Sequence, residues 1–190
     1  MDPIRSSELF LTHYLTFKFA RECVSVLEKI DRNSSETSFA YNFLASNALE
    51  LYGKSCMCLR WDREDNFDIE EIKKRAFAFG HDLDRIYHYQ GVGKEFLSDA
   101  GIKKVSLKNT KKYGISLYYF KFQMVDNSTI IVFHTESLRY GVLAKKRNDV
   151  LPTPAKNLLD LCKLMEDTTL KFLKIIQKKQ SQPRRLNLIY

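Results

Sequence analysis

Two long stretches of the chain repeat apolar residues at three- and four-residue steps, and no proline interrupts either of them. Residues 6–31 and 37–60 both follow this spacing, which predicts two long amphipathic helices. Ser6 or Ser7 can cap the first helix, and the polar run "RNSSET" separates it from the second. A third long helix is predicted at 154–179, and it begins with the second of two prolines. Helices of this length bury their apolar faces against one another, so a helical bundle is expected.

Shorter elements are predicted between these helices. A short helix at 68–78 leads to a corner at Gly80, a further helix occupies about 82–90, and "QGVGKEFLSDAG" is irregular or helical. Residues 113–134 are rich in Tyr, Phe, Ile and Val, and the turn-like run "VDNST" divides them, which predicts a β-hairpin. The expected fold class is therefore mainly α, a helical bundle with an inserted β-hairpin.

The composition fits this fold and gives it a basic character. The chain has only seven Gly and four Pro, which argues against a turn-dense all-β protein. Residues 1–180 are expected to form a single helical domain, and 181–190 a basic C-terminal tail. The formal net charge of +8 favours polyanionic partners such as nucleic acid or phosphorylated ligands.

The sequence lacks the motifs of several other function classes. No phosphate loop, dinucleotide glycine fingerprint or G-x-S-x-G elbow is present, and no cofactor is expected. The four histidines are scattered, and the cysteines at 23, 56, 58 and 162 do not have zinc-ligand spacing, so no metal site is predicted. Reduced, buried thiols fit a cytoplasmic protein. No secretory signal and no apolar run long enough for a membrane span is found, so no membrane contact is expected.

Two short motifs in this order resemble the HEPN superfamily. The first is "FLASNALELYGKSCMCL" at 43–59, where an Ala-Leu-Glu-x-x-x-K pattern begins at Ala48 and includes Glu50 and Lys54. The second is "GHDL" at 80–83, and "LRY" at 138–140 is also similar to members of this family. The resemblance implies a HEPN-like bundle of four or five helices that is commonly a homodimer. It also implies nucleotide or RNA chemistry, in a defence or toxin–antitoxin type of system.

The resemblance also suggests a catalytic motif. Catalytic members of the family are metal-independent endoribonucleases with an Arg-x4–6-His motif, and Arg75 and His81 match it with five residues between them. Arg85 and His88 are a second candidate pair, because residues three apart share one face of a helix that begins at 82.

A structural interpretation of the same histidine competes with the catalytic one and is the one we favour. Gly80 permits the turn, Asp82 can cap the following helix, and His81 can bridge to the neighbouring helix, with Glu50 as the expected partner. The four residues would then form a structural corner rather than an active site.

A lysine-rich region surrounds the predicted hairpin. Tyr118, Tyr119 and Phe120 lie within it and could stack on the bases of single-stranded nucleic acid. The candidate nucleic-acid-binding residues are Lys103, Lys104, Lys108, Lys111, Lys112, Lys145, Lys146 and Arg147. The simpler alternative is that the aromatic residues pack on the bundle and the lysines keep an edge strand soluble.

The sequence therefore predicts a HEPN-like protein that binds RNA or nucleotide, with catalysis left open. The alternative is a non-enzymatic protein-interaction or dimerisation module, in which the hairpin and the basic tail engage another protein.

Overall fold

The computed structural model describes residues 3–31, 37–63, 68–89, 93–112, 115–135, 137–138 and 156–181. Six helices and three strands lie in this part of the chain. In order they are α1 (Pro3–Leu27), α2 (Ser38–Arg63), α3 (Ile69–Ala78), α4 (Leu83–His88), α5 (Gly93–Asp99), β1 (Ile102–Lys112), β2 (Ile115–Met124), β3 (Thr129–Phe133) and α8 (Leu158–Ser181). The expectation of a mainly α chain is confirmed.

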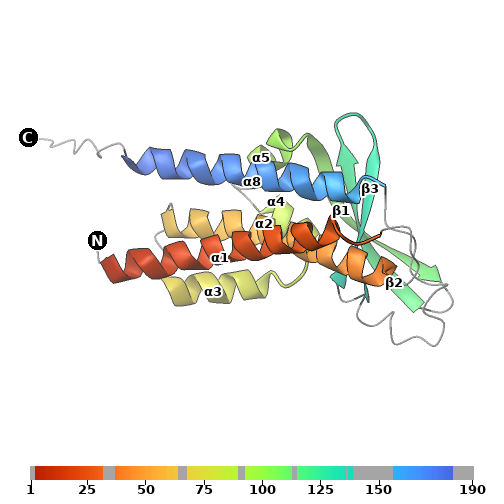
Figure 1. Cartoon of the computed structure of the whole chain (residues 1–190), viewed down its shortest axis with the longest axis horizontal. Coiled ribbons are helices and arrows are strands. Elements are labelled where there is room, and N and C mark those ends of the chain that lie inside the picture. The colour runs from red at the N-terminus through yellow and green to blue at the C-terminus, as the bar shows by residue number, and fades with distance from the viewer. Residues whose placement is uncertain are drawn as a thin grey trace, which may run out of the picture.

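The long helices run lengthwise and the sheet stands at one end of them (Figure 1). Helices α1, α2 and α8 pack side by side, and α3 and α4 both contact α2. The sheet is joined to the helices mainly through α4 and α5 on the β1 side and through α2 and α8 on the β3 side.

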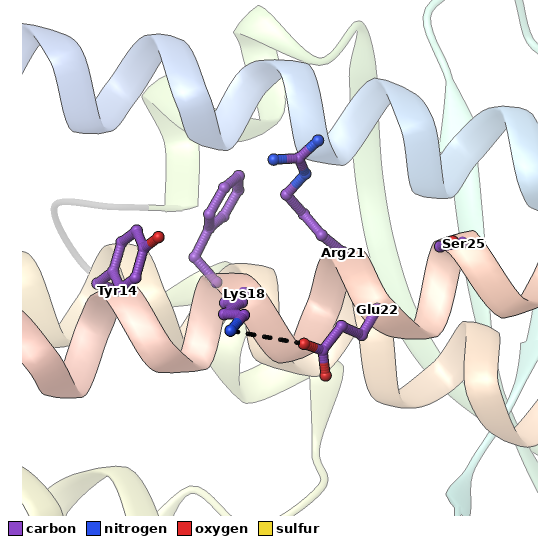
Figure 2. A pocket seen from close by; sticks show the side chains of 6 residues that line it. Tyr14, Lys18, Arg21, Glu22 and Ser25 are labelled. Carbon is purple, nitrogen blue, oxygen red and sulfur yellow. Dashed lines mark ion pairs between the residues drawn. The ribbon is translucent and has the colours of Figure 1, made fainter.

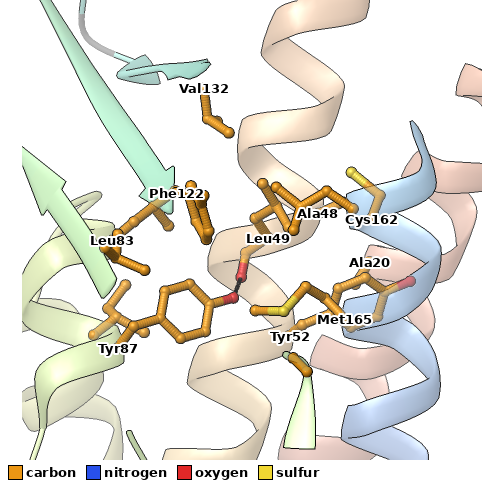
Figure 3. Close-up of a cluster of buried hydrophobic side chains, with 14 of the residues drawn as sticks. Ala20, Ala48, Leu49, Tyr52, Leu83, Tyr87, Phe122, Val132, Cys162 and Met165 are labelled. Atoms are coloured by element: carbon orange, nitrogen blue, oxygen red, sulfur yellow. Dashed lines mark hydrogen bonds between the residues drawn. The ribbon is translucent and has the colours of Figure 1, made fainter. Parts of the chain in front are cut away.

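Helix α2 is the centre of the core, because its neighbours lie on several sides of it. Leu49 and Tyr52 are fully buried, and Figure 3 shows them between α4 and the sheet on one side and α8 on the other. The Tyr87 hydroxyl from α4 donates a hydrogen bond to the Leu49 carbonyl, which fixes α4 against α2. Burial raises the pKa of Tyr87 well above its ordinary value, so this hydroxyl stays a donor.

A second buried tyrosine links the three long helices. The Tyr52 hydroxyl donates to Glu166 Oε2 on α8 over 3.0 Å, and Arg21 Nε on α1 contacts Glu166 Oε1 at 2.7 Å. Burial, with the neighbouring Glu166 carboxylate, raises the pKa of Tyr52. One carboxylate therefore receives a donor from each of the two other long helices.

The close contact between α2 and α4 depends on Gly53. A Cβ atom placed at Gly53 would lie 2.5 Å from Ile86 Cγ2 and 3.2 Å from the nearest atom of the Tyr87 ring. Ile86 is buried and β-branched, so its side chain cannot easily rotate away. The glycine therefore sets the distance between the two helices.

The predicted hairpin is one part of a larger sheet. Strands β2 and β3 pair antiparallel around a turn where the sequence predicts it, with Phe122 opposite Ile130. The basic segment before β2 is not only a flank of the hairpin, because residues 102–112 form β1, which pairs antiparallel with β2. The two-stranded prediction is thus corrected to a three-stranded sheet in the order β1-β2-β3. The lysines of β1 make the segment resemble a solvated loop, although its side chains at Ile102 and Val105 are buried.

The other expectations on the fold have mixed outcomes. The last helix begins at Leu158 rather than at 154, and "GVGKEFLSDAG" contains α5. Residues 182–190 of the expected tail lie outside the described residues. The described helices include none that is long and apolar enough to cross a membrane.

All four cysteines lie in described helices and are free thiols. Three of them, Cys56, Cys58 and Cys162, are buried, and Cys23 is partly exposed. Burial raises the pKa of Cys58 to about 12, and it raises the pKa of Cys56 and Cys162 as well. Buried thiols with raised pKa values are poor nucleophiles, so they serve as small core side chains.

Replacing Gly53 by alanine is expected to destabilise the protein. The substitution gains up to about 1 kcal/mol of helix propensity, but the added methyl overpacks the contact with Ile86, at a cost of about 1 to 3 kcal/mol. Urea unfolding measures the difference. Ile86→Ala in the same background removes the clash, so the two changes together should cost less than their sum. A Gly53→Ala protein more stable than wild type would contradict this packing.

Candidate functional site

A buried carboxylate on α2 lies at the centre of the predicted corner. The side chain of Glu50 is 7% exposed, and its two oxygens are bound by different partners. Lys54 Nζ, one turn later on the same helix, lies 2.8 Å from Oε1, and His81 Nδ1 lies 2.7 Å from Oε2. A carboxylate at this depth needs such partners, because removal from water penalises its charge. The structure therefore brings Glu50 and His81 together, as the sequence pairs them.

The backbone around His81 has the features that a sharp turn requires. Gly80 has a φ of +56°, in the left-handed region that glycine adopts without steric cost. Asp82 precedes α4, and its side chain accepts a hydrogen bond from the Arg85 backbone N–H over 3.2 Å. The chain therefore ends α3, turns and starts α4 within a few residues, with His81 directed at α2.

Aromatic side chains also support the turn. Phe79 packs between Trp61 at the end of α2 and Tyr89 after α4, with ring centroids 5.9 Å and 5.4 Å away. Trp61 Nε1 donates to the Tyr89 hydroxyl over 2.8 Å. This cluster ties both ends of the turn to the same helix that carries Glu50.

The other candidate catalytic residues have local partners in the structure. Arg75 Nε lies 2.7 Å from Glu71 Oε1, one turn earlier on α3. Arg85 donates to the Ala78 carbonyl over 3.3 Å and its guanidinium lies over the Phe79 ring, 5.3 Å from the centroid. His88 Nδ1 lies 2.7 Å from Asp84 Oδ1. Arg85 thus contacts the turn itself, Arg75 forms an ion pair within α3, and His88 Nδ1 contacts the side chain and the carbonyl of Asp84 within α4.

The geometry at His81 allows two uses. A carboxylate that contacts Nδ1 fixes the orientation of the imidazole and leaves the other ring nitrogen, Nε2, to accept a proton. A general base is held in this way. The side chain of His81 is 32% exposed, so solvent reaches part of it. RNA cleavage also needs a cation that can bind phosphate beside the base, and the Lys54 ammonium and the Arg75 guanidinium both contact carboxylates instead. The contacts around His81 favour the structural corner.

A second candidate site is the face of the sheet that points away from the helices. Opposed residues of an antiparallel sheet lie on the same face, so the register gives three rows across β1, β2 and β3. We call these nine residues the outer face. The rows are Lys108–Tyr119–Phe133, Ser106–Lys121–Ile131 and Lys104–Gln123–Thr129.

Opposite the outer face, β2 and β3 bury apolar side chains against the bundle. Phe120, Phe122, Ile130 and Val132 are all at most 3% exposed and belong to the core. Since side chains alternate along a strand, β2 directs Phe120 and Phe122 to the bundle and Tyr119 and Lys121 to the outer face. The strand thus carries core residues and surface residues in strict alternation over this stretch.

The outer face is positively charged. Lys104, Lys108 and Lys121 are all exposed, and none of the nine residues is acidic. Across the described residues, no ion pair involves these three lysines. Lys121 was not among the residues selected from the sequence. Its shared parity with Tyr119 along β2 is the signal that could have identified it.

The structure places only some of the predicted basic residues. Lys103 is exposed at the irregularity in β1, beside Lys104. Lys111 and Lys112 belong to β1, but the positions of their side chains are not described. Lys145, Lys146 and Arg147 lie outside the described residues.

The surface of the described part of the chain includes a depression on the sheet and another along a helix. One is lined by Leu107, Lys108, Asn109, Tyr118 and Tyr119 on β1 and β2, next to the outer face. The other runs along α1, where Figure 2 shows Tyr14, Lys18, Arg21, Glu22 and Ser25 around it. Lys18 and Glu22 face each other there at 4.0 Å, and Arg21 is bound to Glu166. The groove on α1 thus offers no obvious set of reactive groups.

The described residues contain no cluster of three or more His, Cys, Asp or Glu side chains placed to hold a metal ion.

Comparison with known proteins gives no match to a family model, to a curated protein or to a solved structure. The functional argument therefore rests on the residues of this chain and their geometry.

Replacing His81 by alanine is expected to lower the free energy of unfolding by about 1 to 2 kcal/mol, because Glu50 Oε2 loses its partner while it stays buried. His88→Ala is the matched control: this histidine also contacts a carboxylate, but on an exposed surface, and should cost no more than about 0.5 kcal/mol. Urea unfolding of both variants measures the difference. Equal losses would contradict the structural role of His81.

Proposed function

We propose that this protein is a HEPN-like, non-catalytic binding protein for RNA or nucleotide. The single observation that carries this proposal is the outer face of the sheet, on which Lys104, Lys108 and Lys121 are exposed without a carboxylate among the nine residues. A cluster of cations of this kind attracts phosphate groups and releases their counterions on binding.

The arrangement of the lysines supports a binding surface rather than a set of unrelated charges. Lys104 and Lys108 lie on β1 on either side of Ser106, and Lys121 lies opposite Ser106 on β2. From ordinary strand spacings, the Cα atom of Lys121 is about 8 Å from each of the other two. Like charges this close repel each other, so a bound polyanion is stabilised by relieving that repulsion.

The position of this surface agrees with its proposed role. The buried face of the sheet is held by the helical bundle, while the outer face contributes little to the core. Side chains on the outer face can thus suit a ligand without loss of packing in the core. The sheet provides a rigid platform, which limits the entropy lost on binding.

The corner around His81 is proposed to be structural, which leaves the protein without a nuclease centre there. Its imidazole and the neighbouring Lys54 both contact one buried carboxylate. From the HEPN resemblance we also propose that the protein forms a homodimer and belongs to a defence or toxin–antitoxin type of system.

Neutralising the three lysines is expected to weaken binding to a labelled RNA. The triple variant Lys104→Gln, Lys108→Gln and Lys121→Gln should make the negative slope of log affinity against log salt shallower by about 2, since each phosphate contact to a single strand contributes roughly −0.7. Fluorescence anisotropy at several salt concentrations measures the slope.

The matched control for this experiment neutralises three exposed lysines of the helices, Lys74→Gln, Lys171→Gln and Lys174→Gln, and changes the net charge equally. This control should leave the slope nearly unchanged. If both triple variants lose affinity equally, binding follows net charge alone and the proposed surface is wrong. If wild type binds neither the RNA nor a free nucleotide even at low salt, the proposed function is wrong.

The RNA is expected to stay intact when it is incubated with the protein in EDTA. A structural His81 does not transfer protons, so gel analysis of a labelled RNA should show no products above a protein-free control. Cleavage that disappears in His81→Ala but persists in His88→Ala would instead establish a metal-independent nuclease at the corner, provided that circular dichroism shows the variants to be folded.

A further inference from the structure

The outer face exposes an aromatic ring and an apolar side chain among its lysines. A purely electrostatic contact does not require such apolar surface. Tyr119 lies between Lys108 on β1 and Phe133 on β3, and its ring centroid is 6.2 Å from that of Phe133. Ile131 follows on the neighbouring row beside Lys121 and is 40% exposed. Tyr119 is partly exposed, whereas Phe133 is 8% exposed and supports it.

This mixture distinguishes between forms of nucleic acid. A duplex encloses its bases and presents its phosphates, so it would contact lysines and leave an exposed ring between them unused. A single strand offers unstacked bases, each with a flat π-face that can lie on an aromatic side chain. The outer face has a ring at one row and cations on the rows around it, which fits the single strand.

The polar side chains of the outer face fit the same ligand. Ser106, Gln123 and Thr129 alternate with the lysines and apolar groups, and they can donate or accept hydrogen bonds at base edges or sugar hydroxyls. The area of the three rows is about 10 by 13 Å from strand spacings, so it accommodates only a few nucleotides.

The edge of the sheet on the β1 side is held in place by the bundle. The Leu107 backbone N–H donates to Asp84 Oδ2 on α4 over 3.0 Å, so this point of the edge is already hydrogen-bonded. Asp84 also binds His88, which holds its carboxylate in position. The β1 lysines next to Leu107 are thus presented on a fixed strand.

We propose that the outer face binds single-stranded nucleic acid in preference to duplex, with a base stacked on Tyr119 and phosphates bound by Lys104, Lys108 and Lys121. This inference rests on the proposed function and specifies its ligand. Tyr119 and Lys121 are its central residues, and they come from the middle strand β2.

The test compares an unstructured oligouridine with an RNA duplex of the same length, by fluorescence anisotropy at one salt concentration. Wild type is expected to bind the single strand more tightly. Tyr119→Leu should weaken single-strand binding by about 5- to 100-fold, which corresponds to the loss of one stacked base. Tyr119→Phe keeps the aromatic ring and should retain most of the wild-type affinity for the single strand.

Phe77→Leu provides the matched control. Phe77 is an aromatic residue on α3 and is 87% exposed, and α3 packs on α2 rather than on the sheet. This variant should change single-strand affinity less than twofold. Urea unfolding of the two Tyr119 variants and of Phe77→Leu checks that the fold remains intact.

The possible results separate the two proposals. Equal affinity for single strand and duplex, or an unchanged affinity in folded Tyr119→Leu, overturns this inference but leaves RNA binding in place. Binding to neither RNA nor uridine monophosphate at low salt overturns the proposed function itself. The same assay is run with a single-stranded DNA of matching sequence and with free uridine monophosphate, because both offer a base and a phosphate to the same residues. Comparable binding of the monophosphate would overturn a site that extends over several nucleotides.

Discussion

The Glu50 carboxylate determines how the middle of this molecule is assembled. It is buried on α2, and an unpaired charge there would cost several kcal/mol. Lys54 supplies one partner from the same helix, but His81 comes from a different element and reaches Glu50 only if α3 ends and α4 begins at the observed position. The requirement to pair one carboxylate thus fixes the turn, and α4 is then positioned against α2 at the close contact that Gly53 permits.

The position of α4 has a consequence at the sheet. Asp84 on α4 accepts a hydrogen bond from Leu107 on β1, and the core of the sheet packs on the same group of helices. A chain of contacts therefore leads from Glu50 through His81 and α4 to the strand that carries Lys104 and Lys108. The corner and the outer face differ in kind. The polar groups of the corner pair with one another, whereas the lysines of the outer face are exposed to solvent. This difference is why binding is assigned to the sheet and support to the corner.

The sequence predicts the helices well because their signals are local. The apolar period defines α1, α2 and α8, and the Gly80–Asp82 pattern marks the turn before α4. Strand β1 was not predicted, since its lysines resemble a solvated segment and its pairing with β2 is a non-local contact. The partner of His81 was predictable from residue chemistry, because a buried glutamate on a neighbouring helix needs a donor. Lys121 was overlooked because it lies within an aromatic run, and only the register shows that it shares a face with Lys104 and Lys108.

The alternation along β2 explains how one short strand can serve both stability and binding. Phe120 and Phe122 are fully buried against the bundle, and Tyr119 and Lys121 alternate with them in sequence but lie on the other face. A one-residue slip in register would exchange the two sets, placing a lysine in the core and two phenylalanines in water. The hydrophobic burial that stabilises the sheet therefore also fixes which side chains reach solvent, and the outer face is a direct consequence of how the core is packed.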